Sequence, residues 1–202
     1  MIKLKKNKTI IIGESGSGKS YTALNIALKK KGTTFICNGC VSKSYYEKSF
    51  PSLKEYEDKD GAYNFIPQRN GKYYIYKSLR QFVPDSEFLH ALILGCDYGY
   101  FGNDRNATFV FDDNAWVASN SNLLTLWQLS HVDCRIIITA DSICDILKIK
   151  ENDFTKEMVK DISRYWDICR TCKQISEGKA AIALQCTTGI AEYLFSPQHH
   201  QK

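Results

Sequence analysis

Short β-branched runs along the chain alternate with segments in which apolar residues recur at helical spacing. Five β-prone runs can be recognised, at residues 9–12, 33–37, 107–113, 135–142 and 180–186. Helical periodicity marks three segments between them, at residues 19–31, 123–131 and 153–173. Because strands that alternate with helices form parallel sheets covered by those helices, the pattern predicts an α/β fold with a mostly parallel sheet flanked by helices.

The pattern is weaker in residues 41–106, a stretch rich in Tyr and Lys that we interpret as an insertion. An Asn-Gly pair at 70–71 lies between two β-prone runs and predicts a hairpin with a type I′ turn, and residues 85–96 predict a helix. The polar, glycine-rich segment 97–106 carries aromatic residues, which either stack on nucleic-acid bases or belong to a folded turn. A length of 202 residues favours a single domain, 1–202, that includes this hairpin and helix insertion.

The first β-prone run leads into G-x-x-x-x-G-K-S at residues 13–20, directly before the first predicted helix. This is a complete phosphate-binding loop, or Walker A motif, with the strand before it and the helix after it that such a loop requires. Its glycines allow backbone N–H groups to curl around a phosphate, and the helix adds the positive end of its dipole. Lys19 is expected to reach the β- and γ-phosphates, and the Ser20 hydroxyl to bind Mg²⁺. The expected nucleotide contacts are the loop and the residue after it, namely Gly13, Glu14, Ser15, Gly16, Ser17, Gly18, Lys19, Ser20 and Tyr21.

A second chemical signal is the run ATFVFDD at residues 107–113, a β-prone strand that ends in two carboxylates. In a protein with a phosphate-binding loop, such a strand is the expected Walker B element. We expect Asp112 to hold Mg²⁺ through water, and Asp113 to orient or activate the attacking water. The alternative is an acidic turn after a strand, without a metal. An extra strand lies between the loop and this acidic strand, which indicates the RecA-like, additional-strand (ASCE) class of P-loop NTPases.

The net charge of +5 is compatible with a nucleic-acid partner but does not require one. Lysines cluster in residues 3–8 and at 29–31, where they form either a solvated face or a patch that contacts a polyphosphate.

Eight cysteines include two pairs, 37/40 and 169/172, with the spacing of metal ligands. They either bind zinc or pack in the core as small hydrophobic residues, and packing along the predicted helix 153–173 is better supported for the second pair. Disulfides are the least expected, because the chain shows neither a membrane span nor a cleaved signal peptide. The protein is therefore expected in the cytoplasm, which would be the host cytoplasm if the protein is viral.

With these motifs in place, the sequence resembles the FtsK/HerA superfamily of DNA-pumping ATPases, and in particular its small viral branch. That branch contains genome-packaging ATPases and the zonular occludens toxin-like assembly ATPases of filamentous phages. The resemblance is carried by GESGSGKS at 13–20, FVFDD at 109–113 and SHVDCRIIITADSICDIL at 130–147. It covers the predicted core, about two thirds of the chain, and excludes the insertion.

The resemblance implies further site residues and partners. Arg135 matches an arginine that in the family serves a neighbouring subunit, and Thr139 or Asp141 occupies the position of a polar sensor. It also implies ATP and Mg²⁺ as cofactors, DNA as a partner, a homo-oligomer that forms a hexameric ring, and a capsid or membrane assembly partner. Two positions depart from the family pattern, since the family usually has Glu where Asp113 stands and Gln where Asp141 stands.

Two other functions fit the same motifs. A nucleoside or nucleotide kinase is the first, although the six arginines of the chain form no lid-like cluster in the sequence. The second is an assembly scaffold that binds ATP without appreciable turnover, which the departures at Asp113 and Asp141 favour. Phosphate release, transfer of phosphate to nucleosides, and binding without release distinguish the three.

Overall fold

The computed structural model of the protein describes residues 4, 6–38, 43–55, 71–76, 106–112, 122–176 and 179–186. Its strands are β1 (Lys8–Ile12), β2 (Thr34–Asn38), β3 (Lys54–Glu55), β4 (Lys72–Tyr76), β5 (Thr108–Asp112), β6 (Arg135–Ala140), β7 (Asp167–Ser176) and β8 (Lys179–Cys186). Its helices are α1 (Lys19–Leu28), α2 (Lys43–Ser49), α4 (Asn122–Ser130), α5 (Ile143–Leu147) and α6 (Lys156–Tyr165), with a 3-10 turn, η1 (Glu151–Asp153).

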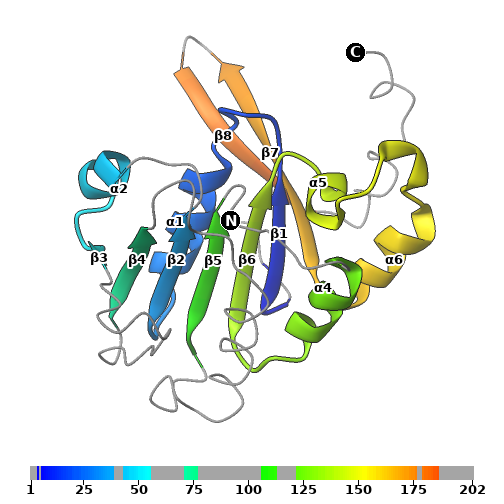
Figure 1. Ribbon diagram of the computed structural model, residues 1–202. Helices are drawn as coiled ribbons and strands as arrows, with labels where there is room; N and C mark the ends of the chain where they lie inside the picture. Colours follow the sequence, from blue (N-terminus) through cyan, green and yellow to red (C-terminus); the bar gives the residue numbers. More distant parts are fainter. Residues whose placement is uncertain are drawn as a thin grey trace.

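All eight of these strands belong to one sheet, in the order β3-β4-β2-β5-β6-β1-β7-β8 (Figure 1). Every neighbouring pair is parallel except β7 and β8, so seven parallel strands are followed by one antiparallel edge strand. β6 lies between β1 and β5, with Ile11 opposite Thr139 and Phe111 opposite Ile138. The predicted mostly parallel sheet is confirmed. β2, the extra strand expected from its place between the loop and the acidic strand in the sequence, lies on the far side of β5, and the strand that separates β1 from β5 in the sheet is β6.

The central strands β5, β6 and β1 are buried on both faces, which is why their sequences read as nearly continuous apolar runs. Successive residues of a strand point to opposite faces, so Ile10 and Ile11 enter different hydrophobic clusters. On one face, the cluster contains Leu126 of α4 and Ile162 of α6. On the other, it contains Leu24 of α1 together with residues of α2. The helices therefore cover both faces, and Figure 1 shows α4, α5 and α6 together on the right-hand side.

The long helix expected at 153–173 is wrong in its second half. α6 ends at Tyr165, Trp166 is extended (φ −115°, ψ 138°), and the chain continues as β7 along the free side of β1. Trp166 is buried and donates from Nε1 to the carbonyl of Leu126 at 3.3 Å, which anchors the turn between helix and strand. Cys169 lies in the core as expected, but on a strand, and it is disulfide-bonded, so the expectation of a reduced thiol there is also wrong.

The two lysine clusters of the sequence differ in exposure. Lys8 is buried, and its Nζ donates to the carbonyl of Val132 at 2.7 Å and to that of Cys134. It ties the start of β1 to the turn before β6, so a solvated or phosphate-binding role is wrong for this residue. The lysines at 29–31, in contrast, are exposed.

Parts of the predicted insertion lie outside the described residues: the first arm of the hairpin, the helix 85–96 and the segment 97–105. The second arm is β4, which pairs in parallel with β2 and β3 in the described part of the chain. Helix α2 also belongs to this insertion and was not predicted. None of the helices within the described ranges is long and apolar enough to cross a membrane.

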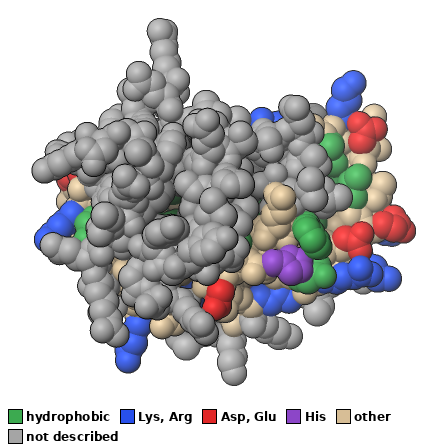
Figure 2. All heavy atoms as spheres, turned by 60° about the horizontal axis from the view of Figure 1, so that its bottom comes forward, with side chains coloured by type: hydrophobic (Ala, Val, Ile, Leu, Met, Phe, Trp, Pro, Cys, Tyr) green, Lys and Arg blue, Asp and Glu red, His purple; other side chains and the backbone are tan. Residues whose placement is uncertain are grey.

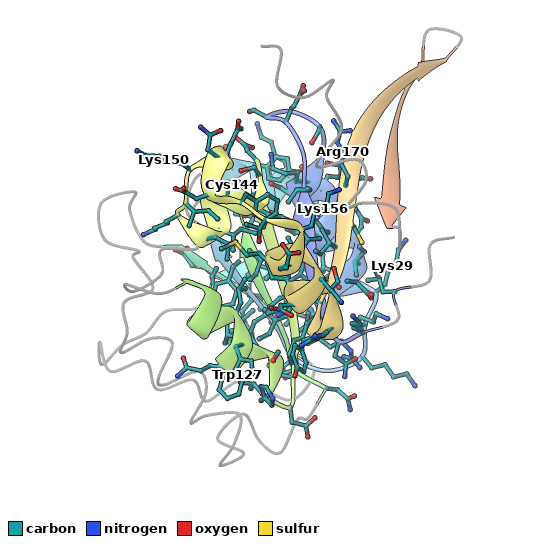
Figure 3. The ribbon with its side chains drawn as sticks, turned by 90° about the vertical axis from the view of Figure 1, so that its right-hand side faces the viewer. Lys29, Trp127, Cys144, Lys150, Lys156 and Arg170 are labelled. Atoms are coloured by element: carbon teal, nitrogen blue, oxygen red, sulfur yellow. The ribbon has the colours of Figure 1, made fainter. Side chains whose placement is uncertain are left out.

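An exposed aromatic cluster lies on α4 and α6, near the edge of the sheet where β6 begins. The Trp127 and His131 rings are 4.6 Å apart, and those of His131 and Tyr165 are 5.4 Å apart. The face drawn in Figure 2 carries hydrophobic side chains next to basic groups, and Figure 3 shows Trp127 projecting from α4. This surface is at the end of the molecule opposite the phosphate-binding loop.

Candidate functional site

The carboxyl ends of the parallel strands meet at the upper edge of the sheet in Figure 1, and the sequence motifs lie there. The loop 13–18 follows β1, Asp112 ends β5, and Asp141 follows β6. In open α/β sheets, this edge is where ligands bind. Since neighbouring strands are about 4.8 Å apart, β1 and β5 lie about 10 Å apart, with β6 between them.

The base of the loop is held tightly against β6 and β7. The N–H of Gly13 donates to the carbonyl of Ala140 at 3.3 Å, and the hydroxyls of Ser17 and Thr171 are hydrogen-bonded at 2.7 Å. A Cβ on Gly13 would lie 2.5 Å from Thr171 Oγ1 and 2.7 Å from Ser17 Oγ, which no side chain could tolerate without displacing them. Glycine is therefore required here by the close approach of β7.

The tip of the loop is open. Gly16 has φ +75°, a left-handed conformation that glycine adopts without strain, and among the described residues no atom lies within 4 Å of the place a Cβ would take. Gly18 is the N-cap of α1 with φ +89°, and it provides no side-chain cap for the first turn, which also contains no acidic residue. The N-terminal end of α1 therefore presents its partial positive charge toward the loop, as an anion-binding helix end requires.

Lys19 is almost fully buried, at 5% exposure, and its ammonium lies across the mouth of the loop. Nζ donates to the carbonyls of Gly13 at 2.8 Å and Glu14 at 3.2 Å, and to Oδ1 of Asp141 at 2.6 Å. The Asp141 side chain is 58% exposed. The loop thus folds around its own lysine, and the predicted sensor residue Asp141 is its ion-pair partner.

Asp112 is fully buried and is held from two sides. Thr139 of β6 donates its hydroxyl to Oδ1 at 2.9 Å, and Tyr46 of α2 donates its hydroxyl to Oδ2 at 3.0 Å. Burial, and then the negative charge of Asp112, raise the pKa of the Tyr46 hydroxyl far above its usual range, so it stays protonated and remains a donor. Thr139 and Asp141, which were alternatives for one sensor position, therefore have different contacts, with Asp112 and with Lys19.

The donor set at this edge fits Mg²⁺, which prefers oxygen ligands. The carboxylate of Asp112 and the hydroxyl of Ser20, a half-buried residue in the first turn of α1, are the oxygen groups that would hold the ion. For zinc, no cluster of three or more His, Cys, Asp or Glu side chains occurs within the described residues. Cys37 is buried in the core, where burial raises the pKa of its thiol well above the usual range.

The remaining predicted site residues lie elsewhere. Arg135 begins β6, so it lies at the amino ends of the parallel strands, opposite the phosphate-binding loop. Its NH1 donates to the carbonyls of Asn106 at 2.7 Å and Lys31 at 3.1 Å. It therefore lies away from the loop of its own chain. The exposed ring of Tyr21 rests against Phe50, with 5.9 Å between ring centroids. Asp113 lies outside the described residues.

Tyr46 is the site residue that the sequence did not indicate. It lies in the insertion, 66 positions before Asp112, in a stretch that contains many tyrosines. No local pattern distinguishes it from Tyr45, its half-buried neighbour.

A parallel sheet with helices on both faces and a strand-loop-helix phosphate motif at its carboxyl edge defines the α/β P-loop NTPase fold. Among solved structures, the chain is similar to the flagellar accessory protein FlaH from Methanocaldococcus jannaschii. The TM-score is 0.51 at 17% sequence identity, over 90% of this chain and 78% of FlaH. This likeness shows the fold. No family model and no curated protein matches the sequence.

Proposed function

We propose that the protein is a Mg²⁺-dependent ATPase that acts as an oligomer to translocate or package DNA or to assemble a phage. The observation that supports this most directly is that Lys19 and Asp112 lie at the same edge of the sheet, with β6 between their strands. A buried ammonium at a phosphate-binding loop and a buried carboxylate two strands away are the two charged groups that nucleotide hydrolysis requires. A cytoplasmic location, expected from the sequence, stays a prediction.

Each group of the chain has a defined task in this proposal. The N–H groups of residues 13–20 and the Lys19 ammonium bind the phosphates, where they stabilise negative charge that grows during transfer. Ser20 and Asp112 hold Mg²⁺, which when bound neutralises phosphate charge. Asp113 orients the attacking water and accepts its proton. Asp141, as the partner of Lys19, keeps the ammonium at the mouth of the loop.

The oligomer and DNA belong to the proposal because of the resemblance to the FtsK/HerA superfamily. Arg135 lies at the edge opposite its own loop, as expected of an arginine that serves the site of a neighbouring subunit in a ring. Its contacts with Asn106 and Lys31 are equally compatible with a structural role. A net charge of +5 and the exposed lysines at 29–31 favour a polyanionic partner.

The test is phosphate release by the purified protein with and without DNA, together with its mass in solution. We expect Mg²⁺-dependent release that DNA stimulates, a particle of about six chains, and a loss of several orders of magnitude in Lys19→Ala. Lys160→Ala, at an exposed lysine of α6, is the matched control and should retain turnover. Unchanged turnover in Lys19→Ala would falsify the mechanism.

A nucleotide-dependent scaffold is the second candidate, and the Lys19–Asp141 pair favours it. A carboxylate 2.6 Å from the loop lysine stands where the family usually has an uncharged glutamine, and it reduces the positive charge that a transition state would use. Tight Mg²⁺·ATP binding with no release, with or without DNA, would identify this function. A kinase is less favoured, because β6 separates β1 from β5 and simple kinases usually lack such a strand.

A further inference from the structure

Helix α2 lies over the same edge of the sheet as the phosphate-binding loop. It follows β2, the strand that pairs with β5 and brings Asn38 opposite Asp112. From α2, the buried Tyr46 donates its hydroxyl to Oδ2 of Asp112 at 3.0 Å. The contact joins the insertion to the carboxylate that is proposed to hold the metal.

A second contact joins α2 to the loop helix. Phe50, the residue after α2, packs against Tyr21, which directly follows Ser20 in α1. Phe50 also contacts Tyr45, with ring centroids 6.1 Å apart. In the same hydrophobic cluster, the Tyr46 ring lies with Leu24 of α1. Tyr46 of α2 therefore contacts Asp112 directly, and Phe50, the residue after α2, contacts Tyr21, the neighbour of Ser20 in the sequence.

The two hydroxyl donors that Asp112 has among the described residues come from different kinds of element. Thr139 is part of β6, which is paired on both sides in the centre of the sheet. Tyr46 is on α2, a seven-residue helix outside the sheet. Because Asp112 is fully buried, solvent does not replace a lost donor, so removing the Tyr46 hydroxyl removes one of the contacts that orient Oδ2.

We infer that Tyr46 is a positioning residue for Asp112, and that α2 is consequently coupled to the occupancy of the metal site. The inference rests on the proposed function and extends it to a residue and a helix outside the nucleotide motifs. A donor that orients a metal-holding carboxylate usually changes metal affinity by about 10- to 100-fold when it is removed. Binding of Mg²⁺ with nucleotide should in turn stabilise α2, because linkage is reciprocal.

The test is the Mg²⁺ dependence of binding of a fluorescent ATP analogue to wild type and Tyr46→Phe, which removes only the hydroxyl. We expect the Mg²⁺ concentration for half-maximal binding to rise about tenfold in Tyr46→Phe, with binding in EDTA unchanged. Tyr45→Phe loses the same atom from the adjacent position and should shift the Mg²⁺ dependence less than about twofold. An unshifted Tyr46→Phe overturns the inference while the ATPase proposal stands.

Hydrogen exchange on the wild type tests the coupling without a variant that could misfold. Amides of residues 43–49 should exchange more slowly with Mg²⁺ and nucleotide together than with nucleotide in EDTA, while those of α6 should not change. Equal exchange of α2 in both conditions contradicts the coupling even if Tyr46→Phe does not fold. If the wild type binds no nucleotide, or binds it independently of Mg²⁺, it is the proposed function that fails.

Discussion

Nζ of Lys19 lies 2.6 Å from Oδ1 of Asp141, so the lysine of the phosphate-binding loop is ion-paired with the residue after β6. The same ammonium donates to two carbonyls of the loop, and these contacts fix it over the loop. An incoming phosphate would meet the positive charge of Lys19 and the negative charge of Asp141 together. The balance between the two charges therefore sets the affinity for nucleotide.

Asp141→Asn should bind nucleotide about two- to fivefold more tightly, because it removes one exposed negative charge near the phosphates and exposed charge interactions are of that size. Turnover should fall if Asp141 also senses the phosphate. Equilibrium binding and phosphate release measure the two effects separately. Asp161→Asn on α6, which also pairs with a basic residue, is the control and should bind like wild type. Weaker binding by Asp141→Asn would contradict this account.

Asp112→Asn should abolish the part of nucleotide binding that requires Mg²⁺, because an amide attracts the hydrated ion far less than a carboxylate. Binding in EDTA should stay close to wild type. Tyr46 and Thr139 can both accept as well as donate, so the buried amide keeps hydrogen-bond partners and the fold should survive. Titration of Mg²⁺ against a fluorescent nucleotide measures the effect, and a retained Mg²⁺ response would show that the ion is held elsewhere.

Gly13→Ala should weaken nucleotide binding at least about tenfold and destabilise the fold by about 1–3 kcal/mol, because its Cβ would overlap the hydroxyls of Thr171 and Ser17. Gly16→Ala is the matched variant. Its Cβ meets open space, so only the left-handed backbone, at about 1–2 kcal/mol, opposes it. Thermal unfolding and equilibrium binding should both rank Gly13→Ala as the more damaging change. The reverse order would mean that Thr171 of β7 moves away and makes room for the added methyl group.

Stability should decrease as the pH rises above about 9. Cys37 and Tyr46 have ordinary pKa values of 9.0 and 10.0, and burial raises both in the folded chain. Above those ordinary values the unfolded chain loses protons that the folded chain keeps, so each group lowers stability by up to about 1.4 kcal/mol per pH unit. Denaturant unfolding between pH 8 and 11 measures this slope. Tyr46→Phe should show a shallower slope above pH 10, and an equal slope would contradict the raised pKa.

Mixing variants of Arg135 and Lys19 distinguishes a role of Arg135 in a neighbouring subunit's site from a structural role. If it serves a neighbour, mixtures of Arg135→Ala and Lys19→Ala should recover activity that neither variant has alone, because some interfaces then combine an intact Lys19 with an intact Arg135. A purely structural role predicts loss of its contacts with Asn106 and Lys31, lower thermal stability, and no recovery on mixing. Phosphate release as a function of mixing ratio is the measurement.

The strands that hold the site were predictable because their signals are local. β1, β5 and β6 are buried on both faces, so each appears as an apolar run, and the glycine-rich motif identifies the loop after β1. The boundary between α6 and β7 was missed for a related reason. Trp166, Ile168 and Cys169 are all buried, and a short apolar stretch fits a helix or a strand equally well. Pairing with β1 decides it, and that pairing joins residues far apart in the sequence.

The sequence motifs indicated three charged residues of the candidate site, Lys19, Asp112 and Asp141, but not the contacts that these residues make. Asp112 and Thr139 were both identified, yet their hydrogen bond depends on β5 and β6 being neighbours. Asp141 lies one residue beyond β6, where the chain can turn toward Lys19, whereas Thr139 is within the strand. Tyr46 could not be predicted at all, because its contact with Asp112 joins the insertion to the core.

The position of β6 has a consequence for how the molecule can change. Its neighbours β1 and β5 carry the loop and the carboxylate, and each of them is paired on its other side as well. Opening of a sheet begins at its margins, which here are β3 and β8. The phosphate-binding loop and Asp112 therefore belong to the part of the sheet that unfolds last. The edge strands β3 and β8 can change in sequence or adapt to new partners while the loop and Asp112 keep their positions.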